Sequence, residues 1–177
     1  MERQGIMKAL TAPMQQLGEF EEILRKIRTN RGVLQVSGCI DPQKPHFISC
    51  AAEGYDCRLI ITYSDLRARE LYENYRFFDR DVLYFPAKDL IFFQADIHSN
   101  LLEQQRIAVL KALAERENVT VITTMAACMN HLMPSEIWQK QVLPFAPGDV
   151  LDMEAMKSTL VQLGYERTAQ AEGPGQF

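Results

Sequence analysis

The stretch Arg58-Leu59-Ile60-Ile61-Thr62-Tyr63-Ser64-Asp65 sets the fold class expected for this chain. Its first six residues are almost continuously apolar or β-branched, which predicts a buried strand. Ser64 then offers a helix N-cap, and Asp65 places a favourable charge in the first helical turn. Leu71 and Tyr75 belong to the apolar stripe of the helix that follows. A buried strand that leads directly into a helix is the building unit of parallel α/β sheets.

The same unit recurs towards the C-terminus. Residues 82–85 and 119–123 predict two further strands, because both segments are short, apolar and rich in β-branched or aromatic residues. Between them, residues 100–116 predict a helix that opens with a capping box formed by Asn100 and Glu103. The loop over residues 87–99 carries an apolar cluster that is expected to pack as core or to dock another domain, and its members are Leu90, Ile91, Phe92 and Phe93.

The unit also recurs towards the N-terminus. Residues 33–36 predict another short buried strand, and an amphipathic helix precedes it. The apolar face of that helix consists of Leu17, Phe20, Ile23, Leu24 and Ile27. Pro45 suits the first position of a second helix. Strands of this kind joined by helices predict a doubly wound parallel sheet, in which sites lie at the carboxyl ends of the strands.

The character of the sequence changes after Pro134. Before it, a short helix is expected to bury Met125, Cys128, Met129 and Met133 as core filler. After it, residues 152–163 predict a helix ended by Gly164, and residues 165–172 predict a strand that leads into a Gly-Pro-Gly turn. A turn without a returning strand leaves an unpaired edge. We therefore expect the chain to be a piece of a longer parent protein.

The loop over residues 38–45 stands where a phosphate-binding P-loop, G-x-x-x-x-G-K-[ST], would follow a strand. Gly38 and Lys44 match this pattern. Gln43 replaces the second glycine and introduces a Cβ, whereas Pro45 replaces the hydroxyl residue that binds magnesium. We predict a P-loop NTPase or helicase type of fold whose phosphate loop no longer works.

Neighbouring residues weaken the loop further. Pro42 removes another amide donor, and Asp41 adds a negative charge where phosphate would sit. No Asp-Glu pair follows a strand to hold magnesium. We therefore expect no catalytic residue, no cofactor and no metal. The alternative from the loop alone is an ordinary strand-to-helix connection in an unrelated α/β protein. A nucleophile and base pair of Cys39 and His46 has no third group to orient it.

Composition limits the class of protein. The 177 residues are 47% hydrophobic and 24% charged, as in globular domains, and the formal net charge is −4. This charge argues against a protein whose main task is to grip duplex DNA. The four cysteines show no zinc-binding spacing, and no segment has the length and apolarity of a signal peptide or a membrane span. These features favour a cytoplasmic protein with reduced thiols and no membrane contact.

Several segments, in their order along the chain, carry a wider resemblance. They are Leu34-Gln35-Val36-Ser37-Gly38, Arg58 to Ser64, Leu83-Tyr84-Phe85-Pro86, Glu103-Gln104-Gln105-Arg106-Ile107, Val121-Ile122-Thr123-Thr124, Leu163-Gly164-Tyr165-Glu166-Arg167 and Glu172-Gly173-Pro174-Gly175-Gln176-Phe177. From about Leu17 to Phe177 the chain resembles the N-terminal, UvrB-like module of the bacterial transcription-repair coupling factor (Mfd). The last two segments are the most specific.

The resemblance implies a function in DNA repair. In that family the whole protein couples stalled RNA polymerase to nucleotide excision repair, and its distant motor domains hydrolyse ATP and act on DNA. The N-terminal module is non-catalytic and recruits UvrA. The resemblance implies a degenerate, UvrB-like nucleotide-hydrolase α/β domain over residues 1–134, followed by the start of a small α+β domain, the UvrA-binding domain, over residues 135–177. In UvrB relatives an arginine that follows a Tyr-acid pair contacts UvrA, and Arg167 matches that position. An autoinhibitory or scaffolding role through intramolecular contacts with the motor domains, or an active nucleotide-binding domain, are the alternatives.

Two departures separate the chain from UvrB itself. UvrB has an intact P-loop, whereas residues 38–45 do not form one. UvrB also has a tyrosine-rich hairpin that probes damaged DNA, and the corresponding residues 87–99 contain no tyrosine. The resemblance therefore implies the coupling factor and no damage verification.

Overall fold

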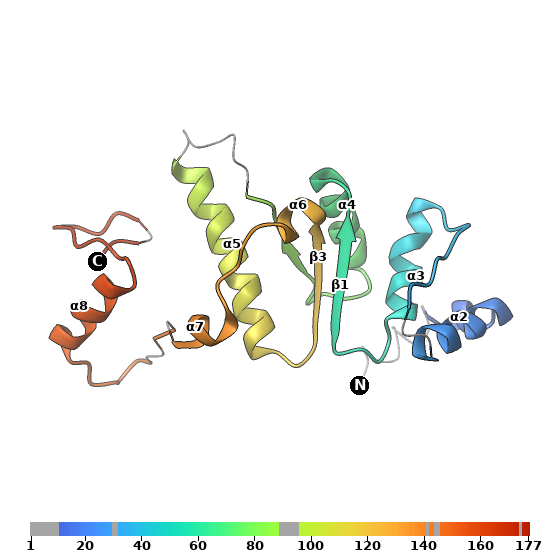
Figure 1. Ribbon diagram of the computed structural model, residues 1–177, viewed down its shortest axis with the longest axis horizontal. Helices are drawn as coiled ribbons and strands as arrows, with labels where there is room; N and C mark the ends of the chain where they lie inside the picture. The colour runs from blue at the N-terminus through green and yellow to red at the C-terminus, as the bar shows by residue number, and fades with distance from the viewer. Residues whose placement is uncertain (1–10, 30–31, 89–95, 141, 144–145, 174) are drawn as a thin grey trace. The chain divides into compact units, whose positions relative to one another are not determined.

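The computed structural model describes residues 11–29, 32–88, 96–140, 142–143, 146–173 and 175–177. The described residues fall into two compact units, one from Met1–Leu90 with Gln104–Asn130 and the other from Ile91–Glu103 with His131–Phe177. The elements are α2 (Gly18–Thr29), the 3-10 helix η1 (Asp41–Gln43), α3 (Lys44–Ala51), β1 (Cys57–Thr62), α4 (Asp65–Tyr75), β2 (Leu83–Phe85), α5 (Asp96–Glu115), β3 (Val119–Thr124), α6 (Met125–Cys128), α7 (Ser135–Lys140) and α8 (Met153–Gln162) (Figure 1).

The first unit is built on a small parallel sheet. Its three strands have the order β1-β3-β2, and both neighbours of β3 run parallel to it. All six residues of β3 are buried, because a central strand is covered on both edges and both faces. The chain is therefore an α/β protein, and the strands predicted near residues 58–63, 82–85 and 119–123 are confirmed to within a residue or so at each end.

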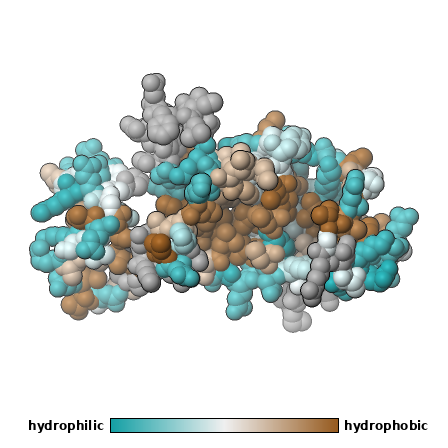
Figure 2. Space-filling view, in the orientation of Figure 1, coloured by the Kyte–Doolittle hydropathy of each residue, from teal (hydrophilic) through white to brown (hydrophobic). Residues whose placement is uncertain are grey.

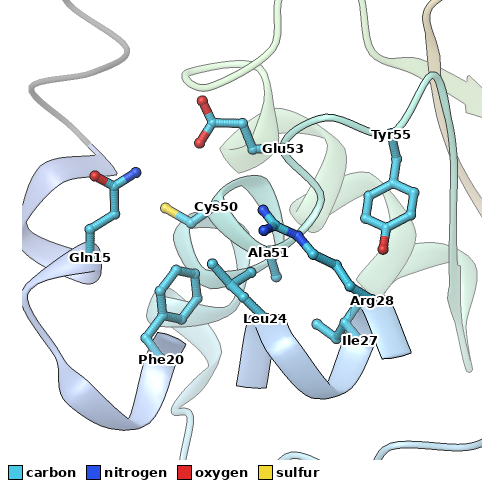
Figure 3. Close-up of a pocket in the computed structure, with 9 residues that line it drawn as sticks. All are labelled: Gln15, Phe20, Leu24, Ile27, Arg28, Cys50, Ala51, Glu53 and Tyr55. Carbon is cyan, nitrogen blue, oxygen red and sulfur yellow. The ribbon is translucent and has the colours of Figure 1, made fainter. Parts of the chain in front are cut away.

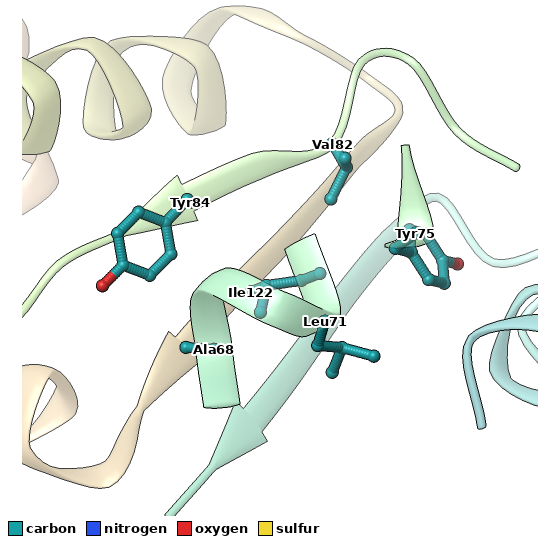
Figure 4. Packing of buried hydrophobic residues seen from close by; sticks show 6 residues of the cluster. All are labelled: Ala68, Leu71, Tyr75, Val82, Tyr84 and Ile122. Atoms are coloured by element: carbon teal, nitrogen blue, oxygen red, sulfur yellow. The ribbon is translucent and has the colours of Figure 1, made fainter. Parts of the chain in front are cut away.

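Two apolar clusters lie on opposite faces of this sheet. On one face, α4 packs against the strands, and the buried cluster consists of Ala68, Leu71, Tyr75, Val82, Tyr84 and Ile122 (Figure 4). On the other face, α5 contributes Val109, and the buried cluster consists of Phe85, Val109, Val119, Val121 and Ala127. The odd and even residues of β3 thus point to different clusters, as the alternation of a strand requires.

β1 lies at an edge of the sheet and is covered on one face only. Ile60 packs against the α4 cluster. On the other face Leu59 is 59% exposed and Ile61 is 48% exposed. Figure 2 shows apolar side chains gathered over the strands of this unit. The prediction that this strand is buried on both faces is therefore wrong for the described residues.

Several helices begin at a residue whose side chain accepts a hydrogen bond from a backbone amide of the first turn. Ser64 Oγ accepts a hydrogen bond from the Arg67 amide at 3.3 Å and begins α4, as predicted. Asp152 Oδ1 accepts from Glu154 and Ala155 at the start of α8. Gly164 follows α8 with a φ of +88°, a conformation that glycine adopts without strain.

Three expectations about secondary structure are wrong. Residues 33–36 form no strand, and Val33 is 95% exposed, because no described strand pairs with them and strand propensity depends on such a neighbour. α5 begins at Asp96, so Asn100 is a helix residue and not the cap. α6 ends at Cys128 after one turn, so it does not reach Pro134.

The expected core filler after β3 is also wrong. Of the four residues predicted to be buried, Met125 is 60% and Met129 is 76% exposed, and Cys128 and Met133 are exposed too. Ala127 is the buried residue of α6. Helical spacing shows which residues share a face, but a single turn does not reveal whether that face meets the core.

Over residues 131–177 the second unit contains α7, α8 and the C-terminal residues, and none of the described side chains in this range is buried. The predicted strand over residues 165–172 does not form. Instead, Glu166 and Gln176 make an isolated parallel bridge, with Glu166 donating to the Gly175 carbonyl at 2.8 Å. Thr168 donates to the Phe177 carbonyl at 2.9 Å. Backbone amides of Glu166 and Thr168 thus find hydrogen-bond acceptors among the last residues of the chain.

No helix in the described part of the chain has the length and apolar character needed to cross a membrane. The residues Leu90, Ile91, Phe92 and Phe93, expected to pack as core or to dock a domain, lie outside the described residues. The predicted domain boundary at residue 134 stays a prediction.

Candidate functional site

The loop before α3 is the first candidate, because its sequence predicts a P-loop that has lost its function. Gly38 has a φ of +92°, in the region that favours glycine. Gln43 has a φ of −83° and a ψ of −23°, and it lies in a 3-10 turn in which its amide donates to the Ile40 carbonyl at 3.0 Å. The Lys44 amide likewise donates to the Asp41 carbonyl. These two amides are bonded within the loop, and Pro45 has none to offer.

The side chains of this loop form a chain of ion pairs with α4. Lys44 Nζ lies 2.7 Å from Asp41 Oδ1, and Arg67 Nη2 lies 2.9 Å from the same oxygen. Arg67 Nη1 also lies 2.8 Å from Glu70 Oε2. The hydrogen bond from Lys44, together with the charge of Arg67, holds the pKa of Asp41 below its ordinary value. Both the lysine of the P-loop pattern and Arg67 are thus bound to a carboxylate of the chain itself.

A polar cluster at the amino ends of β1 and β3 was not predicted from the sequence. Arg58 bonds to the Thr120 hydroxyl at 3.1 Å, to Asn118 Oδ1 at 2.5 Å and to the Tyr55 carbonyl at 2.8 Å. Its guanidinium lies 3.5 Å from Asp79. The cluster lines a cavity of about 410 Å³. Three hydrogen bonds and one ion pair engage the guanidinium here, so Arg58 is built into the fold and is not free to bind an anion.

A smaller cavity of about 100 Å³, lined by both apolar and charged side chains, lies between α2 and α3 (Figure 3). Phe20, Leu24 and Cys50 are among the side chains that line it. Burial raises the pKa of the Cys50 thiol, which makes it a poor nucleophile. Cys50 therefore gives this cavity no reactive thiol.

Two tyrosines are held neutral by the fold. Burial, then the hydrogen bond to Asp65, raises the pKa of Tyr84, whose hydroxyl donates to Asp65 Oδ1. Burial also raises the pKa of Tyr75. Because both folded values exceed the unfolded value of about 10, their contribution to stability is complete below that pH and is lost as the pH rises through the folded values.

We therefore predict that the free energy of unfolding falls as the pH rises above about 10, and that Tyr84→Phe makes this fall shallower. The measurement is urea denaturation at a series of alkaline pH values. Tyr63→Phe is the control, because Tyr63 is 87% exposed and its removal leaves the slope unchanged. An equal effect of the two substitutions would contradict the assignment.

The remaining predicted site residues are not brought together. Arg167 is exposed and, among the described residues, forms no ion pair, not even with Glu166 beside it. His46 stacks on Phe78 with ring centroids 5.4 Å apart, and Cys39 is half-buried in the preceding loop. Within the described ranges no group of three or more His, Cys, Asp or Glu side chains is arranged to hold a metal ion.

No family model matches the chain. It is 32% identical over 99 residues to the transcription-repair-coupling factor of Bacillus subtilis (strain 168), which covers 56% of this chain and 8% of that protein. It is 28% identical over 121 residues to the transcription-repair-coupling factor of Staphylococcus aureus (strain USA300), which covers 67% of this chain and 10% of that protein.

The similarity extends to a second kind of repair protein. The chain is 27% identical over 121 residues to the UvrABC system protein B of Metamycoplasma arthritidis (strain 158L3-1), which covers 65% of this chain and 18% of that protein. The chain thus spans less than a fifth of the length of each of these relatives. It is homologous to transcription-repair-coupling factors and to UvrB, consistent with an N-terminal UvrB-like module of the coupling factor.

Proposed function

We propose that this chain is a non-catalytic module of a transcription-repair coupling factor and that it recruits UvrA. The observation that carries the proposal is the similarity to both coupling factors and UvrB. UvrB and the coupling factor share this region, and a shared partner is the simplest reason for two otherwise different proteins to share one module. RNA polymerase and DNA would then be contacted by other parts of the parent protein.

The contacts within residues 38–45, the predicted P-loop, support the non-catalytic part of the proposal. Lys44 contacts Asp41, and the Gln43 amide contacts the Ile40 carbonyl. A nucleotide would need these groups free, because a P-loop holds phosphate through the lysine and successive backbone amides. The fold is then a P-loop type of α/β domain over residues 1–134 whose nucleotide chemistry has been lost, followed by the start of a UvrA-binding domain over residues 135–177.

Arg167 is our candidate for the UvrA contact. Its guanidinium is exposed and uncommitted to any described carboxylate, so it is free to pair with one on a partner. Arginine is enriched among interface residues that matter, because its planar fork pairs with carboxylates through two hydrogen bonds. The backbone beside it is fixed by the bridge of Glu166 to Gln176.

The test is calorimetric titration of UvrA into the coupling factor that contains this chain. We expect Arg167→Glu to weaken binding by at least about 1 kcal/mol, which is about fivefold. Arg80→Glu is the matched control, since Arg80 is also an exposed arginine but lies in the first unit, and it should leave the affinity unchanged. Absence of binding by the unmutated protein would refute the recruitment role.

A further inference from the structure

Two cations from separate elements converge on one loop carboxylate in the first unit. Lys44 comes from the start of α3 and Arg67 from the first turn of α4, and both reach the same oxygen of Asp41, at 2.7 Å and 2.9 Å. The Arg67 side chain is 23% exposed, while Lys44 and Asp41 are about half exposed. Solvent screens ion pairs at such positions, so this arrangement adds little to stability.

Lys44 and Arg67 are residues of the kind that bind anions. Here the anion that they contact is a side chain of the protein itself, Asp41. An ammonium and a guanidinium that meet at one oxygen are the groups that hold phosphate in proteins. Here a carboxylate satisfies both. Lys44 and Arg67 carry two positive charges, and Asp41 and Glu70 carry two negative charges, so the local sum is zero. An approaching phosphate finds no net attraction and a carboxylate already in place.

We propose that Asp41 is an internal anion that closes a latent phosphate-binding position formed by Lys44 and Arg67. The inference deepens the non-catalytic part of the proposed function and rests on it, because it names the residue that keeps phosphate out. Without the Asp41 charge the local sum becomes +1, and the two cations lose their shared partner. A phosphoryl group, which carries several acceptor oxygens, is the chemical class that would replace it.

The test is the substitution Asp41→Asn, which keeps the size of the side chain and removes its charge. Inorganic pyrophosphate and ATP are titrated separately into the unmutated chain and the variant. We expect the variant to bind pyrophosphate about tenfold more tightly, as the removal of a like charge at contact distance near the surface allows. The gain should shrink as salt rises, because salt screens exposed charges. A thermal melt confirms that the variant is folded.

Two further variants make the result specific. Asp81→Asn removes an exposed carboxylate of the same unit that forms no ion pair with a described residue, and it should leave pyrophosphate binding unchanged. Arg67→Gln in the Asp41→Asn background should remove the gain. An unchanged affinity of the folded Asp41→Asn chain would overturn the inference, as would an equal gain from Asp81→Asn.

The outcomes separate this inference from the proposed function. If the unmutated chain, with Asp41 in place, already binds ATP tightly, Asp41 is not a closing group and the loss of the nucleotide site in the proposed function fails with it. If the variant shows no gain while UvrA still binds the unmutated coupling factor, the inference about Asp41 fails and the recruitment role stands. Both readouts measure binding and neither depends on an enzymatic rate.

Discussion

Ile122→Ala is expected to lower the free energy of unfolding by about 3–4 kcal/mol, within the range for isoleucine-to-alanine changes in protein cores. Ile122 is fully buried at the centre of β3. Its side chain packs in the cluster formed with α4, among Leu71 and Tyr75 (Figure 4). Truncation removes apolar contacts and leaves a cavity that strands held on both sides cannot collapse to fill.

Ile61→Ala is the matched control for this prediction. Ile61 belongs to the neighbouring strand, and the chemical change is the same, but its side chain is 48% exposed. We expect a loss below about 1 kcal/mol there, since half of the side chain is already in water. Urea denaturation followed by circular dichroism gives both values. Equal losses would mean that the α4 face of the sheet is not the main core.

The predicted strands that the structure confirms are those that pair with another described strand, β1 and β2 with β3. Residues 119–123 are all β-branched, and β3 is indeed buried from end to end. Residues 33–36 also predict a strand but form none, because a strand needs a partner and the sequence does not say which segment supplies it. The apolar run of β1 likewise led us to expect a buried strand. In the structure, the side chains of Leu59 and Ile61 are exposed to solvent.

The candidate site likewise combines features that are visible in the sequence with contacts that are not. The departures of Gln43 and Pro45 from the P-loop pattern are visible in the sequence, because the pattern is local. The contact of Asp41 with Arg67 joins residues far apart in the chain, and neither residue is unusual by itself. The cluster of Arg58, Asp79 and Thr120 also needs the register of β1 on β3. Such contacts follow from the packing of the elements, which local patterns do not specify.

The second large effect is expected at this cluster, where Arg58→Met should cost about 2 kcal/mol. The Arg58 side chain is 17% exposed and that of Asp79 is 22% exposed. Loss of one member of a fully buried pair costs about 3–5 kcal/mol, and an exposed pair contributes about 0–1 kcal/mol, so a largely buried pair falls between. Methionine keeps much of the side-chain volume, so the loss reports the hydrogen bonds and the charge.

Arg69→Met is the matched control for this change. Arg69 also pairs with a carboxylate, Asp65, at 2.8 Å, but the arginine side chain is 60% exposed, and we expect a loss below about 1 kcal/mol. A double-mutant cycle then isolates the pair: Asp79→Asn should cost less in the Arg58→Met background than in the unmutated chain. Additive losses would show that the two side chains stabilise the fold independently. Coupling would show that they fix β1 against β3 together, because Arg58 lies on β1 and its partner Thr120 lies on β3.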